Sequence, residues 1–592
     1  MKEILKEYLK CINILRNNYI RFIKYQLTTK ILISIILLPV FYWIVNFLMQ
    51  SKGYGYLTNG LIKNFLFSYQ GIFIILFAVA FGLVIILIEY GGLILISYQS
   101  ISEKKETSYL NVLKYSISKI KYLIGIDGFL LTFYLLLMVP LLNQFFDISI
   151  FNSIKIPGFI MDDINSKLIN QIYLGLVLII FLILSIRWIF VMHIIVLENE
   201  SIKHPLKKSG KLLKNNFKEF IKFLFFITIF NIVISLIIVL LVFFISFIIL
   251  QLIPTEYMDM ASAIVTSVIS MFFTIIAFIY SPLNVILLTK FYLNINNNSI
   301  NINLTNKCKI SIIDKIFKRK KLLILIFTIV IVAFSFISYE MIDNVKYNVK
   351  ITAHRGSTFE APENTISAIK KAIENGADFV EFDVRETKDH KVILLHDGTF
   401  KRTTGLDKAP YELTLKEIQK LDAGSFFSRE YAGEKIPTLE EVIDYAKGKI
   451  KLNIEIKTDP NSVNLVKEVA KIIEDKKMIN SCVVTSLDYD ALLEIKEINP
   501  KIKTGYIIFV AIGDLSKLNV DFYSIEESYV TDTIVENAHK SGRGVYIWTI
   551  NSEESMNNAI KLGVDNIITD NVKELKSILK LNKSLIKSSS GK

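Results

Sequence analysis

Cysteine is scarce in this chain of 592 residues, which has three of them, at positions Cys11, Cys308 and Cys482. Only Cys482 lies in the polar C-terminal half, so a disulfide framework in that half and a zinc site built from cysteines are excluded. The chain also has no P-loop, no serine or cysteine in a recognisable nucleophile setting, and no transporter repeat or channel filter. Its length and composition exclude intrinsic disorder and a small secreted scaffold.

The composition divides the chain into two unlike halves. A mean hydropathy of +0.45 is too high for a soluble protein of this size, yet 21% of the residues are charged, too many for a protein lying wholly in a bilayer. Residues 1–349 carry 33 Lys and Arg against 17 Asp and Glu, whereas residues 350–592 carry 35 against 38. The basic character therefore belongs to the apolar half, which argues against a nucleic-acid partner.

The first half, residues 1–345, is predicted to be a multi-span membrane domain that contacts membrane lipids. A crossing helix needs about 20 apolar residues. The exact number of crossings depends on residues 66–98, where Glu89-Tyr90-Gly91-Gly92 interrupts the run and allows a break or a re-entrant turn, and on the long stretch 220–253. Seven candidate stretches are present: Ile31–Met49, Leu66–Ile88, Tyr122–Leu142, Tyr173–Leu197, Phe223–Leu250, Ala263–Leu288 and Leu322–Ser338.

The distribution of Lys and Arg between the loops predicts the orientation. The N-terminus and the alternate loops on its side carry 27 Lys and Arg, against 4 on the other side. Because cytoplasmic loops retain positive charge, the N-terminus is expected in the cytoplasm. Seven crossings of the plasma membrane then place everything after residue 339 outside the cell, and the basic run at 318–321 before the last stretch supports this orientation.

The second half, residues 346–592, alternates short β-rich runs with amphipathic helical stretches, including 364–374, 437–446, 463–475 and 552–562. Eight such units in about 240 residues are typical of a (β/α)8 TIM barrel. The predicted fold class is therefore an α-helical transmembrane bundle followed by an α/β TIM barrel. The eight expected strands are 349–353, 379–384, 450–456, 482–486, 504–509, 522–525, 544–550 and 566–569, with a ninth short run, 392–395, as a hairpin addition.

Charged side chains gather where the predicted strands end, which is where TIM barrels carry their chemistry. Residues two apart on a strand share a face, so the strand-end carboxylates should converge on one mouth. Burying an acid or a lysine costs free energy unless the side chain is paired or binds a metal. A whole set of such residues at the strand ends therefore indicates a functional site and not a purely structural role. The converging residues are His354, Arg355, Glu381, Asp383, His396, Glu455 and Lys457, with Trp548 at the end of the seventh strand.

These residue types point to metal-assisted cleavage of a phosphodiester. A hard cation prefers oxygen ligands, and Glu381, Asp383 and Glu455 provide carboxylates. Arg355 and Lys457 supply positive charge for phosphate oxygens. Two histidines, His354 and His396, are suited to act as base and acid near neutral pH.

Around these positions the sequence resembles the glycerophosphodiester phosphodiesterase family. The motifs occur in family order over about 350–571, and the apolar half is similar in architecture to the membrane domain that precedes this catalytic domain in some bacterial members. The matching stretches are His354-Arg355-Gly356, Ala361-Pro362-Glu363-Asn364-Thr365, Glu381-Phe382-Asp383-Val384, Leu395-His396-Asp397, Thr403-Thr404-Gly405, Ile436-Pro437-Thr438-Leu439, Asn453-Ile454-Glu455-Ile456-Lys457 and Gly563-Val564-Asp565.

The resemblance implies a TIM barrel with an insertion over about 397–449, and hydrolysis of glycerophosphodiesters to sn-glycerol 3-phosphate and an alcohol. It implies Mg²⁺ or Ca²⁺ on Glu381, Asp383 and Glu455, with His354 as base and His396 as acid. In similar enzymes the glycerol 2-hydroxyl is the internal nucleophile and forms a cyclic phosphate. Trp548 is then expected to offer an apolar wall to the glycerol, unless it is a core aromatic beneath the site.

Two other functions stay open at this point. One is a related lipid phosphodiesterase, acting as a lysophospholipase D or on polyglycerol-phosphate (teichoic acid) chains. The other is a non-catalytic sensor whose barrel binds a headgroup, which the full set of catalytic positions argues against. The released alcohol, the metal, the oligomeric state and the role of the bundle do not follow from the sequence.

Overall fold

The computed structural model describes residues 2–103, 107–123, 168–198, 203–254, 258–296, 300, 302 and 349–580. The described chain forms two compact units. The second unit contains residues 349–580 together with the segment Gly53–Phe67, and the remaining described residues belong to the first. The predicted boundary near residue 345 falls outside the described residues.

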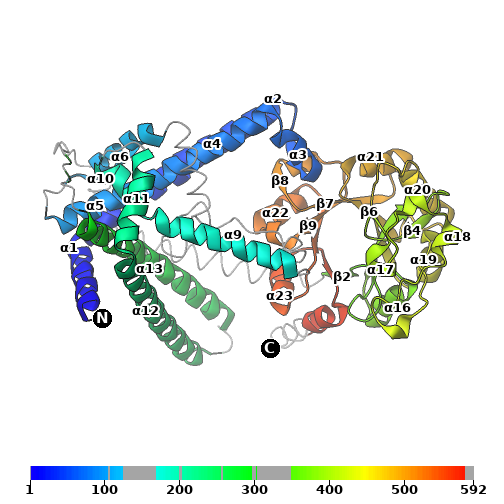
Figure 1. The fold of residues 1–592 in the computed structure, drawn as a ribbon. Helices are drawn as coiled ribbons and strands as arrows, with labels where there is room; N and C mark the ends of the chain where they lie inside the picture. Colours follow the sequence, from blue (N-terminus) through cyan, green and yellow to red (C-terminus); the bar gives the residue numbers. More distant parts are fainter. Residues whose placement is uncertain are drawn as a thin grey trace. The chain divides into compact units, whose positions relative to one another are not determined.

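The described part of the first unit consists of helices, some of which are built from more than one labelled piece (Figure 1). Single pieces are α6 (Tyr109–Ser118), α9 (Leu168–Arg187), α10 (Val191–Glu198), α11 (Lys203–Asn215), α12 (Phe217–Gln251) and α13 (Met258–Ile295). Two continuous helices contain π-helical turns: α1 (Lys2–Leu32), η1 (Ile33–Leu37) and α2 (Leu38–Ser51), and then α4 (Tyr69–Ile86), η2 (Leu87–Gly91) and α5 (Gly92–Ile101).

Five helices in the described part of the chain are long and apolar enough to cross a membrane. They are Leu5–Ser51, Tyr69–Ile101, Leu168–Glu198, Phe217–Ile249 and Phe278–Ile295. Each overlaps a predicted crossing, while 124–142 and 322–338 lie outside the described residues. This is a membrane protein.

The interruption predicted at Glu89–Gly92 is a π-helical turn, and the helix continues through it. Neither a break nor a re-entrant turn occurs there, because the backbone groups stay paired within the helix. The long stretch around 220–253 is likewise a single helix, α12.

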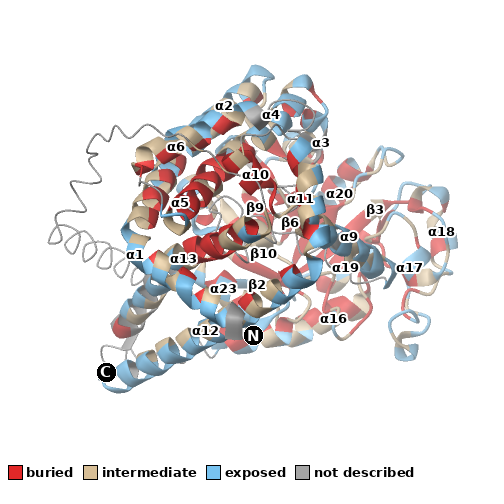
Figure 2. Cartoon of the chain, turned by 60° about the vertical axis from the view of Figure 1, so that its left-hand side comes forward, coloured by how far each residue is buried: buried red, intermediate tan, exposed pale blue. Residues whose placement is uncertain are grey.

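Helix α5 forms the centre of the first unit. Its residues from Gly92 to Gln99 are buried (Figure 2), and it packs against α1 and α13. Gly92 permits this close approach, since a β-carbon there would overlap the ring of Tyr25. By contrast, the most apolar window of α12 has none of its residues buried in the protein. An exposed apolar surface of that extent is suited to contact with lipid.

The second unit is a closed barrel of eight parallel strands. The strand order is β2-β11-β10-β9-β7-β6-β5-β3, and the pairing of β2 with β3 closes the ring. The predicted TIM barrel is therefore confirmed, and every predicted strand is present within a few residues. The strands are β2 (Lys350–Ala353), β3 (Phe379–Glu386), β5 (Lys451–Ile456), β6 (Cys482–Ser486), β7 (Lys503–Ile508), β9 (Phe522–Glu526), β10 (Gly544–Trp548) and β11 (Asn566–Thr569).

The ninth run, β4 (Val392–Leu394), pairs antiparallel with β3 as the expected hairpin. Most helices follow a strand and begin at a capped residue; Thr365, for example, accepts a hydrogen bond from the amide of Ala368 at the start of α16, which stabilises a helix start. The helices are α16 (Ile366–Asn375), α17 (Lys401–Thr404), α18 (Leu415–Ile418), α19 (Leu439–Ala446), α20 (Leu465–Asp475), α21 (Tyr489–Ile498), α22 (Asp532–Lys540) and α23 (Glu553–Lys561).

Two further strands were not predicted from the sequence. The segment between the first two long helices forms β1 (Tyr56–Thr58) and α3 (Asn59–Leu66), and β1 pairs antiparallel with β8 (Ala511–Gly513), which follows β7. Figure 1 shows α3 beside β8. A segment from the apolar half of the sequence is thus part of the barrel unit.

The two ends of the barrel interior differ in chemistry. At the amino ends of the strands, aromatic and apolar side chains fill the ring, with Phe522 stacked on Tyr546 at 4.1 Å between ring centroids and packed near Phe379 and Val483. Two positions further along the strands that carry Phe379, Val483 and Phe522, the residue on the same face is polar and buried. The apolar plug therefore closes one end and leaves the carboxyl-terminal mouth for the charged residues.

A substitution of Gly505 tests the packing of this plug. A β-carbon there would overlap the ring of Phe522, and that ring is stacked on Tyr546. Gly505→Ala should lower the free energy of unfolding by about 1–3 kcal/mol, the usual cost of overpacking. Thermal unfolding of the full chain in detergent measures it. Gly398→Ala is the matched control, since nothing lies within 4 Å of a β-carbon there. An unchanged melting temperature for Gly505→Ala would contradict the described packing.

Candidate active site

Three carboxylates lie together at the mouth of the barrel. The parallel pairing of β3 with β5 sets Glu381 opposite Asn453 and Asp383 opposite Glu455. One oxygen from each of Glu381, Asp383 and Glu455 lies within 4.8 Å of the others. The first two side chains are fully buried and Glu455 is nearly so. The predicted acidic cluster is thus brought together by strand register.

Glu381 gives this cluster the character of a cation site. Its Oε1 is buried and makes no hydrogen bond, although Oε2 accepts one from the backbone amide of Arg355 at 2.7 Å. Burial, reinforced by the charge of Asp383, raises the pKa of Glu381. A buried oxygen without a partner beside other carboxylates is costly, and a divalent cation with oxygen preference would remove that cost. The residues present therefore fit a metal ion.

Two cations, Lys457 and Arg355, face the carboxylates. The Nζ of Lys457 lies 3.2 Å from Asp383 and also contacts Glu455, and the Nε of Arg355 lies 3.6 Å from Asp383. Burial alone would raise the pKa of Asp383, but Lys457 and Arg355 hold it well below its ordinary value. Burial would likewise lower the pKa of Lys457, and the facing carboxylates raise it instead. Both groups are therefore charged at neutral pH.

The turn after β2 carries its residues in a conformation that serves the site. Arg355 has φ of 52° and Gly356 has φ of 89°, both in the left-handed region. This turn points the amide of Arg355 at Glu381 and brings Gly356 so close to α16 that a β-carbon would overlap Ala368. Glycine alone fits that approach. Strained backbone conformations of this kind cluster at functional sites.

His354 pairs with a carboxylate that follows the last strand. Its Nδ1 lies 2.8 Å from Asp570, whose other hydrogen bonds come from Thr358 and Asn551. Since a carboxylate only accepts, Nδ1 must donate and Nε2 is left to accept a proton. Burial would lower the pKa of His354, and the charge of Asp570 outweighs it and raises the pKa.

His396 is held in a parallel way. Its Nδ1 lies 2.8 Å from the side chain of the next residue, Asp397, which also accepts hydrogen bonds from Arg402. The hydrogen bond from His396 and the nearby Arg402 keep the pKa of Asp397 well below its ordinary value. Arg402 in turn binds Glu363, and Glu363 contacts Arg355. A chain of ion pairs thus connects the surroundings of the two histidines.

A cavity of about 460 Å³ opens at this mouth and brings the predicted residues to one space. It is lined by His354, Arg355, Glu381, His396, Glu455, Lys457 and Trp548, among others. Asp383 lies just beneath them, fully buried. Trp548 is half-buried and lines the cavity, and its Nε1 donates to the carbonyl of Ser524 at 3.0 Å. It is not a core aromatic beneath the site.

For several residues of the site, the sequence alone predicts no role. Asp397 and Glu363 occur in the matching stretches without a predicted role, and Asp570 occurs in none of them. Asn364 is another such residue. Its side-chain Nδ2 donates to the carboxylate of Asp383 at 2.9 Å, and its Oδ1 accepts from the backbone amide of Asp383. Asp397 follows His396 directly in the sequence, whereas Asp570, Glu363 and Asn364 become neighbours of their partners only in the folded chain.

Comparison with known families gives a match for each half of the chain. Residues 9–330 match the family described as "Membrane domain of glycerophosphoryl diester phosphodiesterase", and residues 354–574 match the "Glycerophosphoryl diester phosphodiesterase family". The first match alone covers more than half of the chain. The chain belongs to the glycerophosphoryl diester phosphodiesterase family.

Individual relatives cover the barrel half. A glycerophosphodiester phosphodiesterase of Caldanaerobacter subterraneus is 36% identical over 236 residues, 39% of this chain and 97% of that protein. One of Bacillus altitudinis is 31% identical over 233 residues, 37% of this chain and 94% of that protein. Among solved structures, an Oleispira antarctica phosphodiesterase in complex with the product sn-glycerol-3-phosphate is 29% identical, with a TM-score of 0.37 over 40% of this chain and 98% of that one.

The pairing of His354 with Asp570 yields a prediction that needs no turnover. In Asp570→Asn the neutral amide cannot stabilise the imidazolium, so the pKa of His354 should fall. Titration of the full chain by NMR, with labelled histidine, measures this pKa; the chain has six histidines, and His354→Gln assigns the signal. Asp397→Asn is the matched control and should leave the His354 titration in place. An unchanged pKa in Asp570→Asn would mean that the pair does not form.

Proposed function

We propose that this membrane protein is a metal-dependent phosphodiesterase that hydrolyses glycerophosphodiesters to sn-glycerol 3-phosphate and an alcohol. The observation that carries the proposal is the buried cluster of Glu381, Asp383 and Glu455, with Glu381 Oε1 unsatisfied, facing two cations and two carboxylate-held histidines in one cavity. Family membership and relatives named glycerophosphodiester phosphodiesterases support the same activity. We also propose a domain boundary near residue 345, between residues 1–345 and 346–592, with the segment Gly53–Phe67 belonging to the barrel unit.

Mg²⁺ or Ca²⁺ is proposed as the cofactor, held by Glu381, Asp383 and Glu455. When bound, such a cation would neutralise charge on the phosphoryl oxygens and make a nearby hydroxyl more acidic. Arg355 and Lys457 would bind the remaining phosphate oxygens, and their ion pairs with Asp383 keep them in place before substrate arrives. Trp548 would offer an apolar face to the carbon atoms of the glycerol.

The histidines are proposed as the proton carriers of a two-step reaction. Nε2 of His354 accepts the proton of the glycerol 2-hydroxyl as its oxygen attacks phosphorus, and His396 gives a proton to the departing alcohol oxygen. This forms a cyclic phosphate. Neutral His396 then takes a proton from water as the water oxygen attacks, and His354 returns its proton to the 2-oxygen as the ring opens. Asp570 and Asp397 hold the two rings in the tautomer that this exchange requires.

The activity should depend on the metal and on the carboxylates that hold it. With glycerophosphocholine as substrate, EDTA should abolish turnover by the full chain in detergent, and Mg²⁺ or Ca²⁺ should restore it. Glu381→Gln should lower kcat/KM by at least about 10²-fold, because the neutral amide is a poor ligand for a hard cation. Release of sn-glycerol 3-phosphate measures the reaction.

His354→Ala is the control that separates metal binding from proton transfer. It should lose about 10²-fold in turnover, the scale of a lost general base, while the unfolding temperature still rises on addition of metal. Full activity in EDTA would refute the metal assignment. Cleavage of lysophosphatidylcholine or polyglycerol phosphate in preference to glycerophosphocholine would favour the lipid or polymer alternatives, and metal-dependent binding without any turnover would favour the sensor.

We propose further that the protein is a multi-pass protein of the plasma membrane with its N-terminus in the cytoplasm and its barrel outside the cell. The loop charges, 27 Lys and Arg against 4, support this orientation. The pairing of β1 with β8 supports it independently. Residues 53–67 lie between the helices Leu5–Ser51 and Tyr69–Ile101, so after one crossing they are on the side opposite to the N-terminus, together with the strand they pair with.

Cysteine labelling tests the orientation in a Cys308→Ser background, since Cys11 and Cys482 are buried. Lys52→Cys and Lys540→Cys should react with a membrane-impermeant maleimide added to intact cells stripped of wall, because both side chains are exposed and the proposed orientation places both outside. Lys10→Cys is the control for the inner side and should react only after the membrane is opened. The proposal fails if Lys540→Cys also needs permeabilisation.

A further inference from the structure

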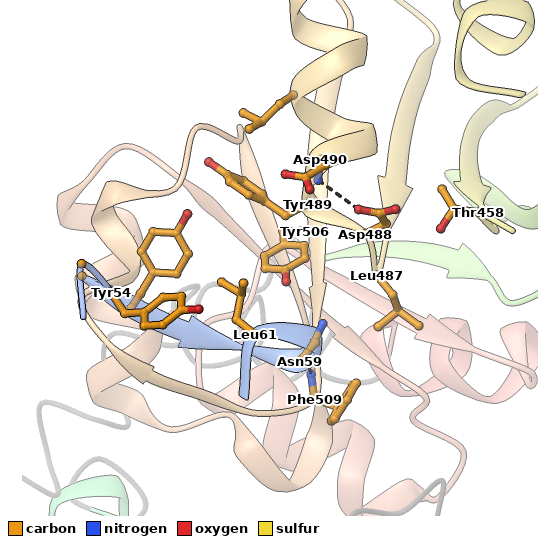
Figure 3. Close-up of a pocket in the computed structure, with 14 residues that line it drawn as sticks. Tyr54, Asn59, Leu61, Thr458, Leu487, Asp488, Tyr489, Asp490, Tyr506 and Phe509 are labelled. Carbon is orange, nitrogen blue, oxygen red and sulfur yellow. Dashed lines mark hydrogen bonds between the residues drawn. The ribbon is translucent and has the colours of Figure 1, made fainter. Parts of the chain in front are cut away.

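A second cavity, of about 790 Å³, lies in the barrel unit beside the active site (Figure 3). One wall is the segment from Gly53 to Leu61, and the opposite wall is the start of α21 and the end of β7. The cavity shares Leu487 and Phe509 with the active-site cavity. A substrate held at the metal cluster could therefore extend one arm past these two side chains into the second space.

The segment wall is held in place by specific contacts. Thr58 Oγ1 lies 2.8 Å from Tyr506 Oη, and both groups are buried. The side-chain Nδ2 of Asn59 donates to the backbone carbonyl of Ile507 at 2.5 Å, and its Oδ1 accepts from the backbone amide of Phe509 at 3.2 Å. With the β1–β8 pairing, these bonds fix the segment against the barrel. The cavity is consequently preformed and does not depend on a mobile loop.

The lining is aromatic and acidic. Tyr489 makes an edge contact with Tyr56 at 6.1 Å between centroids and lies 5.3 Å from Tyr506. Two carboxylates, Asp488 and Asp490, stand at the same wall, and none of the lining residues is Lys, Arg or His. The amino end of α21 carries about half a positive charge, which two carboxylates outweigh. Aromatic faces beside carboxylates are suited to an organic cation, above all a quaternary ammonium.

We propose that this cavity binds a positively charged amine or quaternary ammonium group on the alcohol arm of the diester, and that segment 53–61 supplies one of its walls. The proposal rests on the proposed function and adds a substrate preference to it. It also gives the apolar half of the chain a part in recognition, since residues 53–61 lie between two membrane helices. The phosphate is held by Arg355, Lys457 and the metal cluster, and the cationic arm is selected separately.

Paired substrates test this preference on the full chain in detergent. Glycerophosphocholine carries a quaternary ammonium, and glycerophosphoglycerol carries a neutral arm of similar length. Asp488→Asn combined with Asp490→Asn removes both charges, and Asn at 488 still caps α21. We expect KM for glycerophosphocholine to rise about 10-fold, because its cation loses the attraction of both carboxylates, with kcat and the constants for glycerophosphoglycerol within about twofold.

Two further variants separate the walls and control for charge. Tyr56→Leu keeps an apolar side chain in the segment but removes its ring, so KM should rise for glycerophosphocholine alone. Asp532→Asn, in the first turn of α22 and away from the cavity, should change neither substrate. Unaltered glycerophosphoglycerol kinetics show that each variant is folded. Equal changes on both substrates, or none on either, would overturn the cation site.

Binding of choline alone keeps the result independent of turnover. Calorimetric titration of the unaltered chain with choline should show binding that weakens in the double Asn variant. If neither diester is hydrolysed but choline binds in this way, the proposed activity fails and the cation site stands. If both diesters are hydrolysed and choline binding does not depend on Asp488 and Asp490, the activity stands and the cation site fails.

Discussion

Three carboxylates packed into one end of a barrel are the constraint on which the rest of this unit depends. Ionised acids that lie within 4.8 Å of one another and away from water repel strongly, and burial adds to the cost. The surroundings offset this cost in steps: Lys457 and Arg355 face Asp383, Asn364 donates to it, and the Arg355 amide donates to Glu381. One oxygen is left without a partner, and it marks where a cation would be stabilised.

The barrel provides the rigidity that such a cluster needs. Parallel pairing sets Asp383 beside Glu455, and the aromatic plug around Phe522 closes the opposite end. The charged residues are therefore confined to one mouth, where the two histidines are each anchored by a carboxylate through Nδ1. Because every reactive side chain is held by a neighbour on a strand end or an adjoining loop, the site is organised before substrate binds.

The order of the sequence and the order of the folded units differ at one place. Residues 53–67 precede the second long helix, yet they pair and hydrogen-bond with the barrel through Thr58 and Asn59. Strand addition explains why so short a segment can be held, since β8 presents free backbone groups to a partner strand. The segment links the membrane helices that flank it in sequence to the barrel unit, and it lines a cavity that adjoins the active site.

The sequence alone determined the fold class, the eight barrel strands and the membrane helices that lie in the described residues, because each depends on local hydrophobic periodicity over long stretches. It also identified the residues now found in one cavity, because charged side chains at the ends of apolar strands are visible one strand at a time. Tertiary structure decided the rest. The pairing of His354 with Asp570 joins residues 216 positions apart, and that of β1 with β8 joins segments more than 450 apart. No local pattern encodes such partners. Closure of the barrel brings His354 to Asp570, and the position of residues 53–67 against the barrel brings β1 to β8.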